Sequence, residues 1–484
     1  MDEFFDVDGE ARRALDLLGP APDNWVPARA GIDHDVFIVG GGQTGCALAF
    51  ALRRAGIGRT SVIDAATDET GAGVWLNRAR MKALRTPKTL VGPELDVSGL
   101  GFRAWYEARF GRDAYQSIER APRKQWAAYL AWYRLFLDIP VRYGVRLERI
   151  EPAGEHFRLH LHAAGEARVE TARKVVLCNG VAGNGRAYRP DAFAHLPSAL
   201  VAHTSQVIDF AALRGKSVAV IGAAASAFDA AATALEADAA DVHLFARRDV
   251  LAAKPVSRTR GYPGAYDNYH GLPDALRWSQ ARRFRREGST APRDSIERVT
   301  RFANFHLHLG ASIETARAEG NRIAFSAGGE AFAFDFVIAG TGYVIDLSAR
   351  PELADIAPHV RLWRDQYTPP PAEADAGIGA HPYLGEALEY LEKTPGAASW
   401  LRHIHVYNPA GFVSAGVPVG DVPSMKRDLP AVVRRISRDL FLADLDAHAS
   451  RLEADVPADF DETLYGANVW RRQDQDQPLA QDLS

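Results

Sequence analysis

Cysteine is scarce in this sequence, and long apolar segments are absent from it. Its 484 residues include two cysteines, Cys46 and Cys178, which stand in no C-x-x-C spacing. We therefore expect a reducing compartment and no disulfide framework. No run of about 18 apolar residues could span a bilayer, and the acidic start Met1-Asp2-Glu3 lacks the features of a signal peptide. We expect a cytoplasmic protein that has no membrane partner.

Neither sign of charge predominates. The chain carries 57 lysines and arginines against 61 aspartates and glutamates, which gives a formal net charge of −4. A nucleic acid or an anionic membrane would require a basic surface, so neither is expected as a partner. One hydrophobic core cannot organise a chain of this length, and two or three lobes are expected. A small-molecule substrate remains open, and a homodimer is compatible with this composition.

The most informative stretch is a glycine pattern that follows an apolar run. A strand over 35–39 ends in Gly-x-Gly-x-x-Gly at Gly40, Gly42 and Gly45, and an alanine-rich helix follows. This is the strand, turn and helix of a dinucleotide site. Gly40 permits the tight turn, Gly42 allows a pyrophosphate to approach the backbone, and Gly45 allows the helix to pack closely on the strand.

The residues around this turn complete the predicted cofactor site. The helix begins near Gln43 and Thr44, and its free N–H groups would stabilise the phosphates. Asp64, which precedes Ala65 at the end of the next strand, is placed to accept hydrogen bonds from a ribose. The alternative is a structural βα turn, which the ordered succession of strand, loop, helix, strand and acid disfavours.

Two further segments are rich in residues that contact rings or build a core. Gly73, Val74 and Trp75 belong to a loop in which glycines flank a tryptophan, a composition that suits a backbone lying against a planar ring. An ordinary surface loop anchored by tryptophan is the alternative. Aromatic residues recur at helical spacing between 101 and 137, and we expect most of them in the core, with one or two rings available to a substrate cavity.

The same pattern then occurs a second time. A strand over 216–221 leads to Gly222, with Ala224 and Ala227 in place of the later glycines and Ser226 between them. The first unit closes on a strand that ends at Gly180, and the second closes on a strand followed by Thr341-Gly342-Tyr343. The chain therefore contains an internal repeat of two nucleotide-binding units.

The second strand of each unit ends differently. The first ends in Asp64, whereas the second ends in Arg247 and Arg248. An acid at this position would repel a 2′-phosphate and two arginines can pair with it, so the second unit is expected to prefer NADPH to NADH. The alternative is that both arginines are solvated surface charges.

Together these motifs resemble the class B flavin monooxygenases, which include flavin-containing, Baeyer–Villiger and N-hydroxylating enzymes. The resemblance covers most of residues 34–440 and rests on both glycine turns, on Gly71 to Arg78, and on Thr341-Gly342-Tyr343. It implies FAD and NADPH as cofactors and O₂ with a small organic molecule as substrates. It also implies that NADPH reduces the flavin and that a C4a-(hydro)peroxyflavin then inserts one oxygen atom.

The resemblance suggests three catalytic candidates. Arg78 or Arg85, together with the retained NADP⁺, would stabilise the oxygen adduct. His203 matches the histidine of the family's Phe-x-Gly-x-x-x-His, although the Phe and Gly are missing and a structural role is equally compatible. A pyridine-nucleotide disulfide reductase would need a redox cysteine pair. An NADPH oxidase or flavin reductase without oxygen insertion, or a non-catalytic flavin-binding redox sensor, remains an alternative.

The expected fold class is α/β, with two Rossmann-like dinucleotide-binding domains, for FAD and NADPH, the second inserted in the first. A long insertion beside the NADPH site favours a lid, and a solvated basic helix is the alternative. Pro430 is expected to interrupt a helix over 425–440. The expected divisions are an arm at 1–33, the FAD-binding domain at 34–205 and 346–470, the NADPH-binding domain at 206–345 with its insertion at 251–305, and a flexible tail at 471–484.

Overall fold

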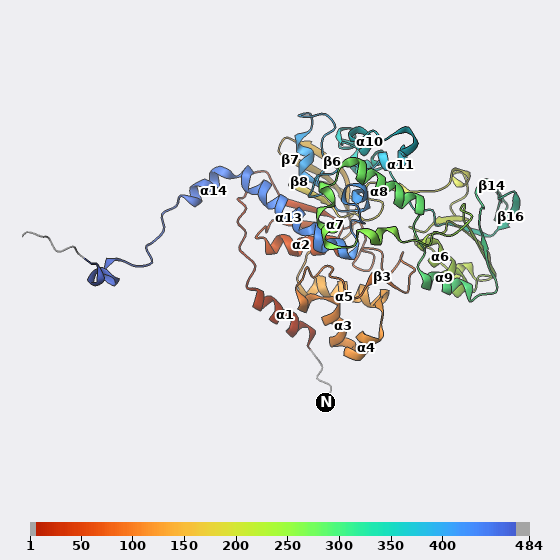
Figure 1. Cartoon of the computed structure of the whole chain (residues 1–484), viewed down its shortest axis with the longest axis horizontal. Helices are drawn as coiled ribbons and strands as arrows, with labels where there is room; N and C mark the ends of the chain where they lie inside the picture. Colours follow the sequence, from red (N-terminus) through yellow and green to blue (C-terminus); the bar gives the residue numbers. More distant parts are fainter. Residues whose placement is uncertain (1–5, 471–484) are drawn as a thin grey trace, which may run out of the picture.

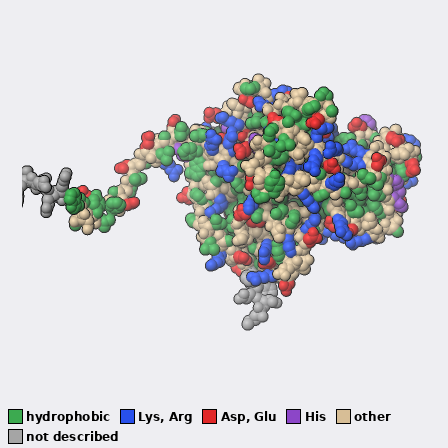
Figure 2. Space-filling view, viewed as in Figure 1, with side chains coloured by type: hydrophobic (Ala, Val, Ile, Leu, Met, Phe, Trp, Pro, Cys, Tyr) green, Lys and Arg blue, Asp and Glu red, His purple; other side chains and the backbone are tan. Residues whose placement is uncertain are grey.

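The computed structural model describes residues 6–470, and the expected tail at 471–484 lies outside this range. Two β-sheets form the body, and helices cover both of them (Figure 1). After α14 (Leu445–Leu452) the chain extends away from the body (Figure 1). No helix between residues 6 and 470 is both long and apolar enough to cross a bilayer. Basic and acidic side chains are both spread over the face shown in Figure 2.

The first sheet is assembled from both ends of the described chain. Its order is β5-β2-β1-β8-β7-β6, and β19 pairs with the C-terminal end of β8. The strands β5, β2, β1, β8 and β19 run parallel, whereas β6 and β7 form an antiparallel extension. The bounds are β1 (His34–Val39), β2 (Thr60–Ile63), β5 (Val141–Arg142), β6 (Val145–Ala153), β7 (His156–Ala163), β8 (Glu166–Leu177) and β19 (Ile404–Val406).

The second sheet is parallel throughout and comes from one stretch of chain. Its order is β10-β17-β11-β12-β13, with α6 (Ala225–Glu236) and α9 (Arg293–Thr300) on one face. An antiparallel sheet, β14-β15-β16, packs on the other face. The bounds are β10 (Val201–His203), β11 (Ser217–Ile221), β12 (Asp241–Phe245), β13 (Phe305–His308), β14 (Ile313–Glu319), β15 (Arg322–Ala327), β16 (Glu330–Phe334) and β17 (Phe336–Ala339).

The nested topology confirms the expected fold class. All strands of the second sheet lie in the sequence between β8 and β19 of the first. The two crossings between the sheets, β9 (Gly185–Ala187) and β18 (Tyr343–Ile345), pair with each other in antiparallel fashion. The two units are therefore joined by a two-stranded ribbon.

The segment expected as an insertion at 251–305 divides into two parts. Its last part consists of α9 and the start of β13. This part belongs to the unit built on the second sheet, because α9 packs on α6 through the buried Val299. The remainder contains α7 (Pro263–Asn268), α8 (Asp274–Glu287) and two short 3-10 helices, Val256–Arg260 and Tyr269–Gly271. The expected basic helix is α8.

The aromatic stretch forms core, as expected. Helices α3 (Phe102–Phe110), α4 (Arg112–Ser117) and α5 (Arg123–Phe136) pack beside α1 (Val7–Leu18) and the small sheet of β3 (Ala83–Pro87) and β4 (Arg120–Pro122). Eight of the rings in this region are buried: Phe102, Trp105, Tyr106, Tyr115, Trp126, Tyr129, Trp132 and Tyr133.

One expectation about the last long helix is wrong. Helix α13 (Val422–Ala443) runs unbroken through Pro430, which was expected to interrupt it. A proline leaves the carbonyl four residues earlier without its helical donor. That residue is Lys426, which is exposed, so water can satisfy the carbonyl. The buried face of the helix, which packs on α2 (Gln43–Arg54), stabilises the rest of the turn.

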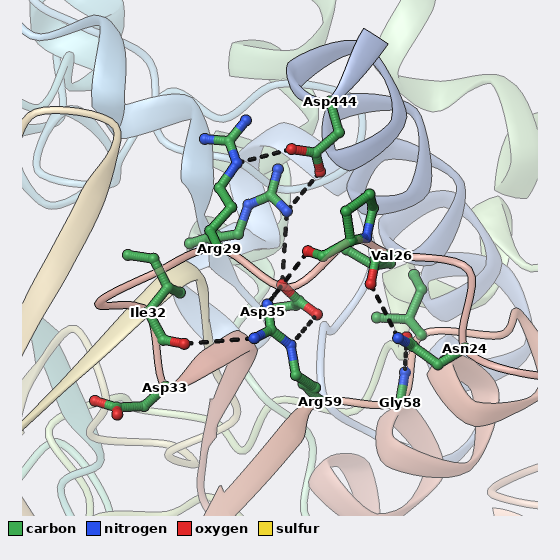
Figure 3. A network of polar contacts seen from close by, with 12 residues as sticks. Asn24, Val26, Arg29, Ile32, Asp33, Asp35, Gly58, Arg59 and Asp444 are labelled. Atoms are coloured by element: carbon green, nitrogen blue, oxygen red, sulfur yellow. Dashed lines mark hydrogen bonds and ion pairs between the residues drawn. The ribbon is translucent and has the colours of Figure 1, made fainter. Parts of the chain in front are cut away.

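A buried ionic network fastens the N-terminal arm to both ends of the first unit (Figure 3). Asp35, at the start of β1, is fully buried and pairs with Arg59 at 2.7 Å. Asp444, after α13, pairs with Arg29 and with Arg173, each at 2.7 Å. Burial opposes ionisation of Asp444, but the hydrogen bonds from the two arginines outweigh it and hold the pKa below its ordinary value.

Candidate functional site

The first glycine turn has the geometry that the sequence predicts. Gly40 adopts a φ of +113°, and a Cβ there would lie 2.3 Å from the carbonyl oxygen of Cys178, which directly follows the neighbouring strand β8. A Cβ on Gly45 would lie 1.9 Å from the Gly40 carbonyl oxygen, so helix α2 can approach the strand only with glycine at this position. A Cβ on Gly42 would meet only Gly73, at 3.6 Å, which brings the predicted ring-contact loop against the turn.

Asp64 is fixed at the end of β2. Its Oδ2 accepts a hydrogen bond from the backbone N–H of Gly41, and its Oδ1 accepts one from that of Ala66, both at 2.8 Å. Ala65 between them is exposed. The carboxylate is therefore held beside the glycine turn, where the ribose of a dinucleotide is expected.

The start of α2 makes contacts that connect distant segments. The Gln43 side chain accepts a hydrogen bond from Trp126 Nε1 at 3.2 Å and donates one to the Gly420 carbonyl at 3.4 Å. Thr44 is buried. Asp421, next to Gly420, caps the N-terminus of α13 by accepting from Ser424 N–H at 3.0 Å, and burial raises the pKa of Asp421 to about 6.

The loop after β2 is a structured loop anchored by its tryptophan. Trp75 packs edge-on against Trp126 with 6.4 Å between ring centroids, and Arg123 donates a hydrogen bond to its carbonyl. Arg78 donates a hydrogen bond to the Gly73 carbonyl, while Val74 is exposed. The loop therefore presents its glycine edge to the first turn.

The second glycine turn repeats the geometry of the first. Gly222 has a φ of +119°, and a Cβ there would lie 2.4 Å from the Gly340 carbonyl oxygen. A Cβ on Gly340 would in turn lie 2.7 Å from Ala227 Cβ, so helix and strand are in close contact. Ala224 is the N-cap residue of α6, and Ser226 in its first turn is exposed. This repetition confirms the internal repeat at the level of individual atoms.

The two closing strands also end alike. Gly180 and Gly342 both have positive φ angles, 74° and 79° respectively. Thr341 donates its hydroxyl hydrogen bond to the Tyr188 carbonyl, which fixes the second of these turns to the connecting ribbon. Tyr343 begins β18 and remains partly exposed.

The two arginines that are expected to recognise a 2′-phosphate differ in their contacts. Arg248 donates to the carbonyls of Arg286 at 2.8 Å and Arg285 at 3.1 Å, and so caps the C-terminus of α8. Arg247 is exposed and makes no hydrogen bond or ion pair with any other described residue. Arg247 is therefore the arginine that is free to meet a ligand.

Arg85 faces the second unit. Its guanidinium pairs with Asp229 of α6 at 3.2 Å, and the same carboxylate accepts from Ser295 at 2.7 Å and from Arg298 at 3.1 Å. Arg298 also donates to the Arg80 carbonyl at 3.1 Å. This group ties β3 to the α6 and α9 face of the second unit.

His203 lies at the end of β10, against the turn at 341–343. Its Nε2–H donates to the Gly342 carbonyl at 3.0 Å, and its Nδ1 accepts from Ser205 N–H at 3.0 Å. Burial lowers its pKa, although the Gly342 carbonyl opposes this shift. A neutral imidazole with both nitrogens engaged holds the turn in place. Burial raises the pKa of the Tyr343 hydroxyl, and the nearby charge of Arg78 reduces this rise.

Several residues that fix the segments around the candidate site could not be found from the sequence. Asn408 donates to Asn179 at 3.0 Å and to Asn184 at 2.8 Å, and thereby fixes the segment that follows β8. Asn408 lies more than two hundred positions after Asn179 and Asn184, so no local motif connects them. Asp229 stands within an alanine-rich helix, where an isolated acid gives no signal of its buried partners.

Both cysteines are buried and free. Burial raises the pKa of Cys46 and of Cys178 to about 12 in each case, so neither forms a thiolate at neutral pH. The two-cysteine chemistry of a disulfide reductase is therefore not supported by these residues.

Comparisons with known proteins agree with this architecture. A family model described as pyridine nucleotide-disulphide oxidoreductase matches residues 37–260. The FAD-dependent urate hydroxylase of Xanthomonas campestris is 36% identical over 440 residues, which are 90% of this chain and 92% of that protein.

Solved structures of N-hydroxylating enzymes share the fold. The ornithine hydroxylase of Pseudomonas aeruginosa superposes with a TM-score of 0.65 at 20% identity, covering 84% of this chain and 99% of that one. The L-lysine 6-monooxygenase of Pseudomonas syringae gives a TM-score of 0.60 at 18% identity, covering 85% and 99%. The chain therefore belongs to the FAD-dependent monooxygenase family that includes the urate hydroxylase, and it shares its fold with the N-hydroxylating class B enzymes.

Proposed function

We propose that this FAD-dependent monooxygenase uses NADPH to hydroxylate a purine-type substrate related to urate. The observation that carries the proposal is the pair of matching glycine turns, one followed by a fixed acid and one by a free arginine. The similarity over nine-tenths of the chain to a urate hydroxylase supports the substrate class.

Each part of the site has a role in this proposal. The N-terminus of α2 would hold the FAD pyrophosphate, and Asp64 would accept hydrogen bonds from its ribose. The N-terminus of α6 would hold the NADPH pyrophosphate, and Arg247 would pair with the 2′-phosphate. Bound FAD, once reduced, supplies the activation of O₂.

The remaining candidates act between the two turns. The loop at 73–78 would lie against the flavin ring, and Arg78, which interacts with Tyr343, would place a positive charge beside the reacting atoms. His203 and Arg85 are bonded within the protein, so we assign them positioning roles at the junction. Together these contacts orient the two cofactors and restrict the access of water.

Rapid mixing of the NADPH-reduced holoenzyme with oxygen tests the proposed function. In the presence of urate we expect a transient absorbance distinct from reduced and oxidised flavin, consumption of urate, and little hydrogen peroxide. Direct return to oxidised flavin with stoichiometric peroxide, with or without urate, would favour the oxidase or reductase alternative.

Replacing Arg247 with alanine should impair the use of NADPH selectively. Loss of a charge-assisted contact to the 2′-phosphate is expected to raise the KM for NADPH by about 10-fold or more and to leave that for NADH nearly unchanged. Arg248→Ala is the matched comparison, and it should mainly lower thermal stability because it removes the cap of α8. Equal changes for both nucleotides in Arg247→Ala would contradict the assignment.

A further inference from the structure

The segment between β12 and α9 contains two arginines that are buried without full pairing. Arg260, at the end of the first 3-10 helix, is 6% exposed, and its Nε and Nη1 have no hydrogen-bond partner among the described residues. Arg277, in α8, is 3% exposed, and the same two atoms lack partners. The Tyr269 hydroxyl is buried beside both arginines, and the Arg260 guanidinium is the group placed to hydrogen-bond to it.

The charges in this cluster do not balance. Arg277 pairs with Asp274 and donates to the Tyr383 hydroxyl at 2.7 Å. Arg260 forms no ion pair with any carboxylate in the described part of the chain, and its guanidinium instead lies 5.7 Å from the centre of the Phe412 ring. A buried cation without an anion is costly, because desolvation is not compensated by pairing. Such a site favours an anionic ligand.

The cluster lies where the second unit meets the C-terminal part of the first. Gly416 packs directly against the Tyr269 ring, and His270 donates a hydrogen bond to the Leu384 carbonyl at 3.1 Å. Four residues after Gly416, the Gly420 carbonyl accepts the hydrogen bond from Gln43 at the first glycine turn. A series of contacts through Tyr269, residues 416–420 and Gln43 therefore links the buried arginine to the first glycine turn.

We propose that Arg260 and Tyr269 form a binding site for the anionic oxo group of a planar heterocyclic substrate. This inference rests on the proposed function, and it names the group that recognises the substrate. The guanidinium offers a planar fork of donors that matches a deprotonated ring with adjacent oxygen and nitrogen atoms. Phe412 and Tyr269 place aromatic rings beside the guanidinium, an environment that suits a planar ring. Urate, which is an anion at neutral pH, has this chemistry.

A nucleotide phosphate is the other source of negative charge. Arg248, which marks the strand end expected to bind the 2′-phosphate, contacts residues 285 and 286 at the C-terminus of α8. Arg277 is nine residues earlier in the same helix, which corresponds to about 14 Å. The cluster is therefore remote from that phosphate position, and the experiment must separate the remaining nucleotide phosphates from the substrate.

The test measures equilibrium binding of urate to the oxidised holoenzyme by calorimetry, for the wild type, Arg260→Met and Arg258→Met. Arg258 is exposed in the same 3-10 helix and is the matched control. We expect Arg260→Met to bind urate about 10- to 100-fold more weakly, with unchanged flavin content and NADPH affinity. Arg258→Met should bind all ligands as the wild type does. Tyr269→Phe should weaken urate binding about 3- to 10-fold.

Caffeine, a neutral purine, is the second probe, and its binding should not depend on Arg260. Weaker NADPH binding or loss of FAD in Arg260→Met, with urate binding unchanged, would overturn the inference in favour of a nucleotide phosphate. If Arg260→Met does not fold, Arg260→Lys keeps the charge without the planar fork and should still weaken urate binding several-fold; wild-type affinity there would overturn the inference. Failure of the wild type to bind urate would instead overturn the proposed substrate, and this inference with it.

Discussion

Replacing Gly42 with valine should give a folded protein that is purified without FAD. A Cβ at this position meets only the Gly73 Cα at 3.6 Å, which is an ordinary contact, so the protein itself can accept a side chain. The added methyl groups would occupy the surface that the pyrophosphate must approach, and its hydrogen bonds to the helix N-terminus would be lost. Two or more such charge-assisted bonds correspond to about 3 kcal/mol or more of binding free energy.

Gly45→Val provides the contrast for this experiment. A Cβ on Gly45 would lie 1.9 Å from the Gly40 carbonyl oxygen, so the helix must move away from the strand and the unit should lose stability. The measurements are the ratio of flavin to protein absorbance and a thermal unfolding curve. Full flavin retention in Gly42→Val would contradict the site assignment, and unfolding of both variants alike would show that Gly42 serves the fold instead.

Replacing Asp229 with alanine should be the most destabilising single change at the junction between the units. Asp229 is 2% exposed, and its carboxylate pairs with the guanidinium groups of Arg298 and Arg85. Arg298 is itself only 5% exposed. Removing one partner of a buried ion pair leaves an uncompensated charge, which typically costs about 3–5 kcal/mol. A fall in Tm of about 10 °C is expected for a unit of this size.

Glu236 offers a control for this prediction within the same network. Glu236 also pairs with Arg298, at 2.9 Å, but it is more exposed and shares its charge with Lys82. Glu236→Gln should therefore cost about 1 kcal/mol or less. Unfolding curves that are the same for Asp229→Ala and Glu236→Gln would contradict the view that burial makes the Asp229 contacts strong.

Local sequence was sufficient to predict the geometry of the two glycine turns. Gly40 and Gly222 need positive φ angles and close contact with a neighbouring carbonyl, and only glycine meets both requirements. These constraints act over a few residues, so they leave a readable pattern. The nesting of the units followed from the order of the two patterns and of the closing strands β8 and β17, which end just before Cys178 and Gly340.

The hydrogen-bond partners of charged side chains such as Arg247 and Arg248 could not be predicted from the local sequence. Arg247 and Arg248 are adjacent and chemically identical, yet Arg248 caps a helix that lies almost forty residues later. Pro430 illustrates the opposite case, since a strong local rule is overridden by the packing of α13 on α2. In both cases the deciding contact is tertiary and is set by how the units pack.

The late position of β19 in the sequence also has a consequence for synthesis on the ribosome. The strands of the second sheet are complete once residue 339 has emerged, so that unit can form early, as domains do during translation. The first sheet must wait for residues 404–406 to cover the edge of β8 and for Asp444 to reach Arg29 and Arg173. The first glycine turn, although synthesised first, would thus be completed last. Under the proposed function, loading of FAD would follow the release of the C-terminal quarter of the chain.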